Sequence, residues 1–280
     1  MKNVLKILIK SFLKFFVYSL SKIRLGRYIL DKLHINITEK KKVIFYKDLK
    51  LEFYVPNRLS YYRVNTFSTK EPETLNWIDG FGEKTVFWDI GSNIGLYSCY
   101  AAKKKQCKIY AFEPSIFNLE WLGRNIQLND LVEKIVVISV PLTETISENM
   151  LNFSSTEWSG ALTTFGQNYT HDGKKLKKKF GFSTIGISID DAKNLMKIPQ
   201  PDYIKVDVDG IEHLILKGGR EVLSNTKELL VEVNEKFEKH NKDCFETLRD
   251  LGFILKEKKH SDLFEKTDFA HSYNQIWIKQ

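Results

Sequence analysis

Four carboxylates in the chain stand at or near the ends of short apolar segments. They are Asp89, Glu113, Asp207 and Glu232. The β-branched and aromatic residues that precede them are typical of buried strands. Ligands of open α/β sheets bind at the carboxyl ends of the strands, so we expect the four side chains to meet at one rim. Carboxylates placed there can accept hydrogen bonds from hydroxyl groups, remove a proton or coordinate a hard cation.

The first of these carboxylates opens a turn that contains two glycines. Asp89 is followed by Gly91 and Gly95, and apolar residues resume at helical spacing from Leu96. Glycine allows the backbone to turn sharply and a ligand to approach it closely, and the following helix directs free N–H groups at that ligand. A plain strand-to-helix turn has the same pattern. Glu113 favours a ligand site, because a carboxylate after the second strand holds ribose hydroxyls in nucleotide-binding α/β folds.

Two stretches of the chain resemble motifs of a known enzyme family. The sequence DIGSNIG at residues 89–95, with FEP at residues 112–114, resembles the S-adenosylmethionine motifs of class I methyltransferases. The sequence YIKVDVDGIE at residues 203–212, with LKG at residues 216–218, is similar to the fourth-strand motif of the FkbM family, which comprises O-methyltransferases of sugars and polyketides. Asp209 departs from that motif, in which Glu is more common.

The resemblance covers roughly residues 71–278 and implies a fold. This is the α/β class I methyltransferase fold, a Rossmann-like, seven-stranded, mostly parallel sheet with helices on both faces, in residues 81–280. Residues 34–80 precede it with a small strand pair and an entry helix, and residues 1–33 form a separate N-terminal segment. Between residues 141 and 201 the alternation of strands and helices lapses, and we expect a solvated loop with a lysine cluster flanked by short strand-like pieces.

The resemblance also implies that S-adenosylmethionine is the cofactor and assigns residues to it. Glu113 would accept hydrogen bonds from the ribose hydroxyls, while Gly91 and Gly95 would let the backbone approach the methionine part. Asp89 would orient the turn or meet the cofactor's ammonium group, and Ser139 would approach the adenine. The full set of expected cofactor contacts is Asp89, Gly91, Asn93, Gly95, Glu113 and Ser139.

Methyl transfer needs an aligned acceptor and a group that takes its proton. A sugar hydroxyl is a poor nucleophile until it is deprotonated, so we expect a carboxylate base, either Asp207 or Glu212. The tight turn at residues 209–210 would return Glu212 toward Asp207. One alternative is a Mg²⁺ site formed by Asp207 with Glu232 or Asn234, which would acidify a bound sugar diol. Another is that Asp207 and Glu212 only cap backbone turns.

The positive charge of the chain is concentrated at its N-terminus. The whole chain carries +8. Residues 1–33 contain eight basic residues and one acidic residue, Asp31, a net +7 that leaves +1 for the remainder. A main domain that is nearly neutral argues against a nucleic-acid partner.

Residues 1–33 are predicted to form one amphipathic helix, or two helices broken near Gly26. Four lysines recur at intervals of four residues, namely Lys2, Lys6, Lys10 and Lys14. The longest uncharged stretch, residues 15–21, is far shorter than the ~20 residues that span a bilayer, and no small-residue cleavage site of a secretory signal follows it. We expect the segment to lie in the plane of an anionic membrane with its lysines toward the headgroups. The alternative is packing on the main domain or on a second copy in a homodimer.

The cysteines indicate the compartment. Cys99, Cys107 and Cys244 are odd in number and lack Cys-x-x-Cys spacing, so neither a disulfide framework nor a zinc site is expected. A reducing cytoplasm is the default for such a chain. With the N-terminal segment, this predicts a cytoplasmic protein that is peripherally associated with the inner face of the membrane.

The function expected from these features is methyl transfer to a hydroxyl. The acceptor implied by the resemblance and the N-terminal segment is a sugar in a surface glycan, such as lipopolysaccharide, or in a glycolipid precursor. An NAD-dependent oxidoreductase or epimerase is disfavoured because the chain has no Gly-x-Gly-x-x-Gly. A third interpretation is a non-catalytic membrane- or partner-binding module on a methyltransferase fold, against which the intact set of carboxylates argues.

Overall fold

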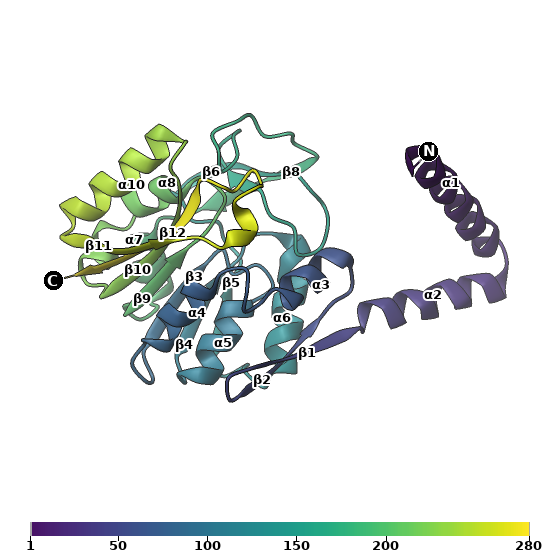
Figure 1. Cartoon of the computed structure of the whole chain (residues 1–280), viewed down its shortest axis with the longest axis horizontal. Coiled ribbons are helices and arrows are strands. Elements are labelled where there is room, and N and C mark those ends of the chain that lie inside the picture. The colour runs from purple at the N-terminus through teal and green to yellow at the C-terminus, as the bar shows by residue number, and fades with distance from the viewer. Residues whose placement is uncertain (1, 280) are drawn as a thin grey trace.

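The computed structural model describes residues 2–279, and its centre is one seven-stranded sheet in the order β11-β12-β10-β9-β3-β4-β5 (Figure 1). Its strands are β3 (Val86–Ile90), β4 (Lys108–Phe112), β5 (Ile135–Ile138), β9 (Tyr203–Val206), β10 (Glu228–Asn234), β11 (Phe253–Lys259) and β12 (Ser272–Lys279). Strands β5, β4, β3, β9 and β10 run parallel, and β12 is antiparallel to both of its neighbours. The predicted seven-stranded, mostly parallel sheet is confirmed.

Helices cover both faces of this sheet, as expected. One face carries α4 (Pro72–Asp79), α5 (Leu96–Lys104) and α6 (Ile116–Leu128). The other carries α7 (Ile189–Met196), α8 (Glu212–Lys217), α9 (Arg220–Ser224) and α10 (Glu238–Asp250). Successive side chains of β3 point to opposite faces, so Phe87 joins the first apolar core and Trp88 the second. Both side chains are fully buried.

The region between residues 141 and 201, which we call the inserted region, contains more secondary structure than its sequence indicates. It forms a three-stranded antiparallel sheet of β6 (Ser147–Phe153), β7 (Thr163–Phe165) and β8 (Phe180–Gly186), with β6 in the middle. The short strand-like pieces expected here fall in β6 and at the end of β8, but their pairing into a separate sheet with β7 was not expected. Phe153 and Phe165 are buried and join the second core. The lysine cluster at residues 174–179 is exposed, as predicted.

Two helices at the N-terminus project from the rest of the molecule (Figure 1). They are α1 (Lys2–Ser21) and α2 (Arg24–Thr38), so the break falls at residues 22–23 rather than near Gly26, and the helical segment continues past residue 33. Gly26 packs at the corner instead: a Cβ there would lie 2.1 Å from the backbone oxygen of Leu20. The side chain of Lys2, the first of the expected lysine repeat, lies outside the described residues.

A strand pair joins these helices to the domain, as expected. Strands β1 (Lys41–Tyr46) and β2 (Leu49–Tyr54) are antiparallel and lead to α3 (Arg58–Asn65). The side-chain oxygens of Asn125 and Asn129 on α6 accept hydrogen bonds from backbone N–H groups of β2. Among residues 2–279, the helices are all too short or too polar to cross a bilayer.

Candidate active site

The glycine turn between β3 and α5 has the strained geometry that its sequence predicts. Gly91 and Gly95 have φ values of +87° and +82°, a region that glycine enters at low cost. A Cβ on Gly91 would lie 1.8 Å from the backbone oxygen of Asp207. The N–H groups of Gly91 and Ser92 both donate to the oxygen of Phe112. The backbone of Gly91 therefore lies against the ends of β4 and β9, which leave no room for a side chain at this position.

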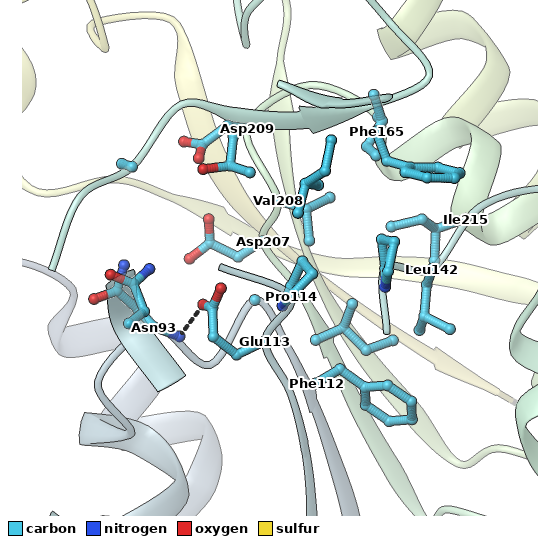
Figure 2. Close-up of a pocket in the computed structure, with 18 of the residues that line it drawn as sticks. Asn93, Phe112, Glu113, Pro114, Leu142, Phe165, Asp207, Val208, Asp209 and Ile215 are labelled. Atoms are coloured by element: carbon cyan, nitrogen blue, oxygen red, sulfur yellow. Dashed lines mark hydrogen bonds between the residues drawn. The ribbon is translucent and has the colours of Figure 1, made fainter. Parts of the chain in front are cut away.

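Glu113 connects this turn to the end of β4. Its Oε2 accepts a hydrogen bond from the backbone N–H of Asn93 at 2.8 Å, and its Oε1 accepts one from Ser115 at 2.7 Å. Burial raises the pKa of the Glu113 carboxyl to about 7, although the two backbone hydrogen bonds oppose that shift. Figure 2 shows this carboxylate directed toward Asn93 at the edge of a cavity.

That first cavity has a volume of ≈ 70 Å³ and a composition that suits a nucleoside. Its apolar wall is formed by Phe112, Val140, Pro141 and Leu142. Glu113 and Asn118 supply polar groups, and Asn118 Oδ1 is buried without a hydrogen-bond partner among residues 2–279. A buried acceptor in this position needs a donor from a ligand or water, which fits the adenosine half of S-adenosylmethionine.

A second, larger cavity of ≈ 440 Å³ adjoins the first. The two share Gly91, Asn93, Ala161, Asp207 and Asp209 in their walls. The larger one extends from there to α3, to the segment before α4 and to the connection between β11 and β12. Aromatic side chains from these elements and from α5 line it, namely Tyr62, Phe67, Tyr97, Phe264 and Phe269. We call it the acceptor cavity.

Asp207 lies where the two cavities meet and is held by a buried cation. Its Oδ2 is 2.5 Å from Lys205 Nζ, and Lys205 is only 1% exposed. Burial acts to lower the pKa of Lys205, but the carboxylates of Asp207 and Glu71 raise it more, so the side chain stays charged. Sequence reasoning missed Lys205. The available signal was a lysine inside a strand whose other residues are all apolar.

Asp209 also lines both cavities. Its Oδ2 accepts a hydrogen bond of 2.6 Å from the backbone N–H of Leu162, a residue of the inserted region. Burial raises the pKa of Asp209 to about 6, and the nearby Asp207 adds to that rise. The position where the chain departs from the FkbM motif therefore faces the site.

Residues 159 and 160, which precede β7, contact the elements that line the two cavities. Ser159 O accepts a hydrogen bond from Arg63 Nε at 2.8 Å. Gly160 O accepts hydrogen bonds from the side-chain amides of Asn93 and Asn118. The inserted region thus bridges the glycine turn and α3, a role that its polar sequence does not indicate.

Three of the expected cofactor contacts lie outside both cavities. Asp89 is 1% exposed and accepts a hydrogen bond from Ser98 Oγ at 2.5 Å, so it braces the start of α5. Gly95 packs against α6, where a Cβ would meet Leu122 at 2.6 Å. Ser139 is exposed after β5, and the cavity wall begins at the next residue, Val140.

Glu212 was expected to be a base, but its position argues for a structural role. It is 1% exposed and lines neither cavity. Its carboxylate accepts hydrogen bonds from the N–H groups of Val208 and Gly210, and it is 2.6 Å from His240 Nε2. Although burial opposes the shift, the charge of His240 leads the contributions that lower the pKa of Glu212. Glu212 thus caps the turn that carries Asp209.

Of the expected magnesium ligands, Asp207 and Glu232 share the acceptor cavity, but Asn234 does not join them. Glu232 lines the acceptor cavity, whereas Asn234 is buried elsewhere and bonded to Lys236 and Ser272. Within residues 2–279, no group of three or more His, Cys, Asp or Glu side chains is placed to hold a metal ion. Asp207 already has Lys205 as its cationic partner.

The chain is similar to known methyltransferases. A family model described as the methyltransferase FkbM domain matches residues 89–255. The hexuronic acid methyltransferase AglP of Haloferax volcanii is 30% identical over 182 residues, which are 65% of this chain and 70% of that protein. The methyltransferase sdnD of Sordaria araneosa is 28% identical over 152 residues, 46% of this chain and 58% of that one.

Solved structures of methyltransferases are also similar to this chain. The tRNA methyltransferase TrmK of M. capricolum, in complex with S-adenosylhomocysteine, is 15% identical with a TM-score of 0.44, over 73% of this chain and 66% of that chain. The family match decides between the methyltransferase and the NAD-dependent oxidoreductase expected as its alternative. The chain belongs to the FkbM family and is an S-adenosylmethionine-dependent methyltransferase.

Proposed function

We propose that this enzyme methylates a hydroxyl group of a sugar in a glycan or glycolipid precursor. The observation that carries the proposal is the place of Asp207, whose carboxylate lines both the nucleoside-type cavity and the acceptor cavity. The acceptor cavity is lined by aromatic side chains and by charged side chains of both signs, a composition suited to a sugar ring with its hydroxyl groups. The similarity to a hexuronic acid methyltransferase supports this acceptor class.

Methyl transfer requires the protein to align the acceptor hydroxyl with the methyl group and to remove the hydroxyl proton. S-adenosylmethionine supplies an electrophilic methyl group when bound. Glu113 and the glycine turn would hold the cofactor, and residues 160–162, which are bonded to Asn93 and Asp209, would help to exclude water from the junction of the cavities. Lys205 occupies Oδ2 of Asp207, which leaves Oδ1 to accept the proton of the acceptor hydroxyl.

Glycan mass spectrometry tests the proposed function. Cells that produce the protein should carry a glycan with one methyl-sized mass increment that cells lacking it do not have. Complementation with Asp207→Asn should fail to restore the increment, whereas Lys236→Ala, a change at an exposed residue that lines neither cavity, should restore it. Identical glycan spectra with and without the protein would contradict the glycan acceptor.

We propose further that α1 places the enzyme on an anionic membrane. Large apolar residues from Val4 to Tyr18 each keep at least 47% of their surface exposed, and lysines at positions 6, 10 and 14 share the helix. An apolar surface of this extent needs a cover, and the accompanying positive charge suits anionic headgroups. Such a location would bring the enzyme to a lipid-linked acceptor.

A further inference from the structure

A third cavity lies at the junction between the N-terminal helices and the domain. Its volume is ≈ 510 Å³, and its walls come from the end of α2, the start of β1 and the segment that opens α3. Val55 and Pro56 form its buried base, and Ile37 and Tyr61 line its sides. We call it the junction groove. Figure 1 shows α2 leading into β1 at this edge of the domain.

The charged side chains that line the junction groove are all positive. They are Lys40, Lys41 and Arg58, each of them exposed. Lys42 adds a fourth cation at the rim, with Nζ 3.4 Å from the hydroxyl of Tyr61. Glu39 is adjacent in sequence but is not part of the groove wall.

Nearby lysines of the same strand pair form ion pairs, whereas the lysines of the groove form none among the described residues. Lys47 pairs with Asp79, and Lys50 pairs with Glu52. In the part of the chain that the structure describes, Lys40, Lys41 and Arg58 have no carboxylate within ion-pair distance; Lys41 lies over the ring of Tyr54 at 5.1 Å. A concavity lined by cations that have no ion-pair partner favours an anionic ligand, and guanidinium and ammonium groups are the side chains that bind phosphate oxygens.

The groove is next to the acceptor cavity, and α3 separates the two. Arg58 and Tyr61 of α3 face the groove, whereas Leu59, Tyr62 and Arg63 of the same helix line the acceptor cavity. On its other side the groove borders α2, which continues to the membrane-directed α1. A ligand in the groove would therefore lie between the membrane and the reaction site.

We propose that the junction groove binds a phosphate or diphosphate group, which in the acceptor links the sugar to its lipid carrier. This assignment rests on the proposed glycolipid acceptor. The groove holds the anion, and the glycan chain attached to it passes α3, so that a sugar further along that chain reaches Asp207. Specificity then depends on the phosphate link as well as on the sugar.

Pyrophosphate binding to the full-length protein tests the groove directly. Calorimetry should show that Lys40→Ala/Lys41→Ala/Arg58→Ala binds inorganic pyrophosphate roughly tenfold or more weakly than the wild type, because three charge-assisted contacts are removed. Lys236→Ala/Lys239→Ala/Arg220→Ala is the matched control, since it removes the same three charges from exposed positions and should bind as the wild type does. Both variants should melt like the wild type and bind S-adenosylhomocysteine equally.

Pyrophosphate binding and vesicle binding together distinguish a phosphate of the acceptor from the phosphates of membrane headgroups. Equal pyrophosphate binding by the wild type and the groove variant would overturn the site. Vesicles of phosphatidylcholine and phosphatidylglycerol should sediment the groove variant almost as well as the control variant. A parallel loss of vesicle and pyrophosphate binding would assign the groove to membrane headgroups and overturn its role in acceptor binding. Pyrophosphate binding that persists without any methylated glycan would instead show that only the proposed acceptor is wrong.

Discussion

At the scale of single residues, the site is defined by one buried lysine and the carboxylate it holds. A charge as buried as that of Lys205 is stable only because carboxylates surround it. Asp207→Asn should lower kcat by about 10²–10⁴-fold, the usual range for loss of a general base, and leave S-adenosylhomocysteine affinity nearly unchanged. Single-turnover kinetics and calorimetry measure the two effects. Undiminished kcat in this variant would show that Asp207 is not the base.

In contrast to Asp207, Glu212 should affect the free energy of unfolding, because its carboxylate is bonded within the fold. Glu212→Gln should reduce the free energy of unfolding by about 1–3 kcal/mol, since a buried carboxylate with three partners is replaced by an amide. The pKa of Glu212 is lowered in the folded state, so its contribution is present above the unfolded value near 4.5 and is lost as the pH falls through the lower folded value. Urea unfolding at neutral pH measures the loss. Unchanged stability with abolished turnover would return Glu212 to a catalytic role.

We expect Glu113 to make the affinity for the cofactor depend on pH. Its pKa of about 7 in the free protein is raised by burial, and the ribose hydroxyls should donate to the ionised form. The affinity for S-adenosylhomocysteine should therefore rise as the pH increases from 6 to 8, and Glu113→Gln should bind more weakly with a flatter profile. Calorimetry at several pH values provides the measurement. An equally steep profile in Glu113→Gln would assign the titration to another group, of which Asp209, with a pKa of about 6, is the first candidate.

The raised pKa of Glu113 also makes the free energy of unfolding depend on pH. Because the folded state of the free protein binds the proton of Glu113 more tightly than the unfolded chain does, the contribution of this group falls as the pH rises from about 4.5 to 7. Bound cofactor should reverse that trend by stabilising the ionised carboxylate.

At the scale of elements, the β3 turn is the part that the sequence predicts best. Glycine spacing specifies the turn because only glycine fits against the backbone of Asp207. Gly91→Ala should destabilise the protein by roughly 3 kcal/mol or more through the positive φ and the clash. Gly123→Ala is the matched control, since nothing lies within 4 Å of its Cβ position on α6, and it should stabilise by about 0.5–1 kcal/mol. Thermal unfolding measures both. A Gly91→Ala protein as stable as the wild type would refute this packing of the turn.

Other elements were predicted less well, for physical reasons. Period and composition indicate strands, but they do not say whether strands pair with the main sheet or with each other. The sheet of β6, β7 and β8 was expected only as short strand-like pieces, because large parts of these strands are exposed or half exposed and lack a continuous apolar run. For the same reason the contacts of Ser159 and Gly160 with the site were not predictable, since they depend on where that sheet packs. Likewise, the burial of Glu212 depends on His240, which a different helix supplies.

At the scale of the whole molecule, the domain and the N-terminal helices differ in net charge and in exposed apolar surface. The domain buries its apolar residues in two cores on either side of one sheet. The N-terminal helices leave theirs exposed and carry most of the net charge. This division was visible in the sequence, because local composition decides it. The direction in which the helices project was not, because it depends on the corner at Gly26 and on the strand pair that follows.

Vesicle binding should show what covers α1. Lys6→Gln/Lys10→Gln/Lys14→Gln should weaken binding to phosphatidylglycerol-containing vesicles by up to about a hundredfold at low salt, since each lysine near an anionic surface contributes about 1 kcal/mol. Lys236→Gln/Lys239→Gln/Lys256→Gln removes the same charge from exposed positions of the domain and should bind almost normally. The difference should shrink as salt rises and the Debye length falls below about 10 Å. Equal vesicle binding by the two variants would refute the electrostatic role of α1. A full-length protein that ignores vesicles but dissociates from dimer to monomer when Phe12 and Phe15 are changed to serine would show that a second copy covers the helix instead.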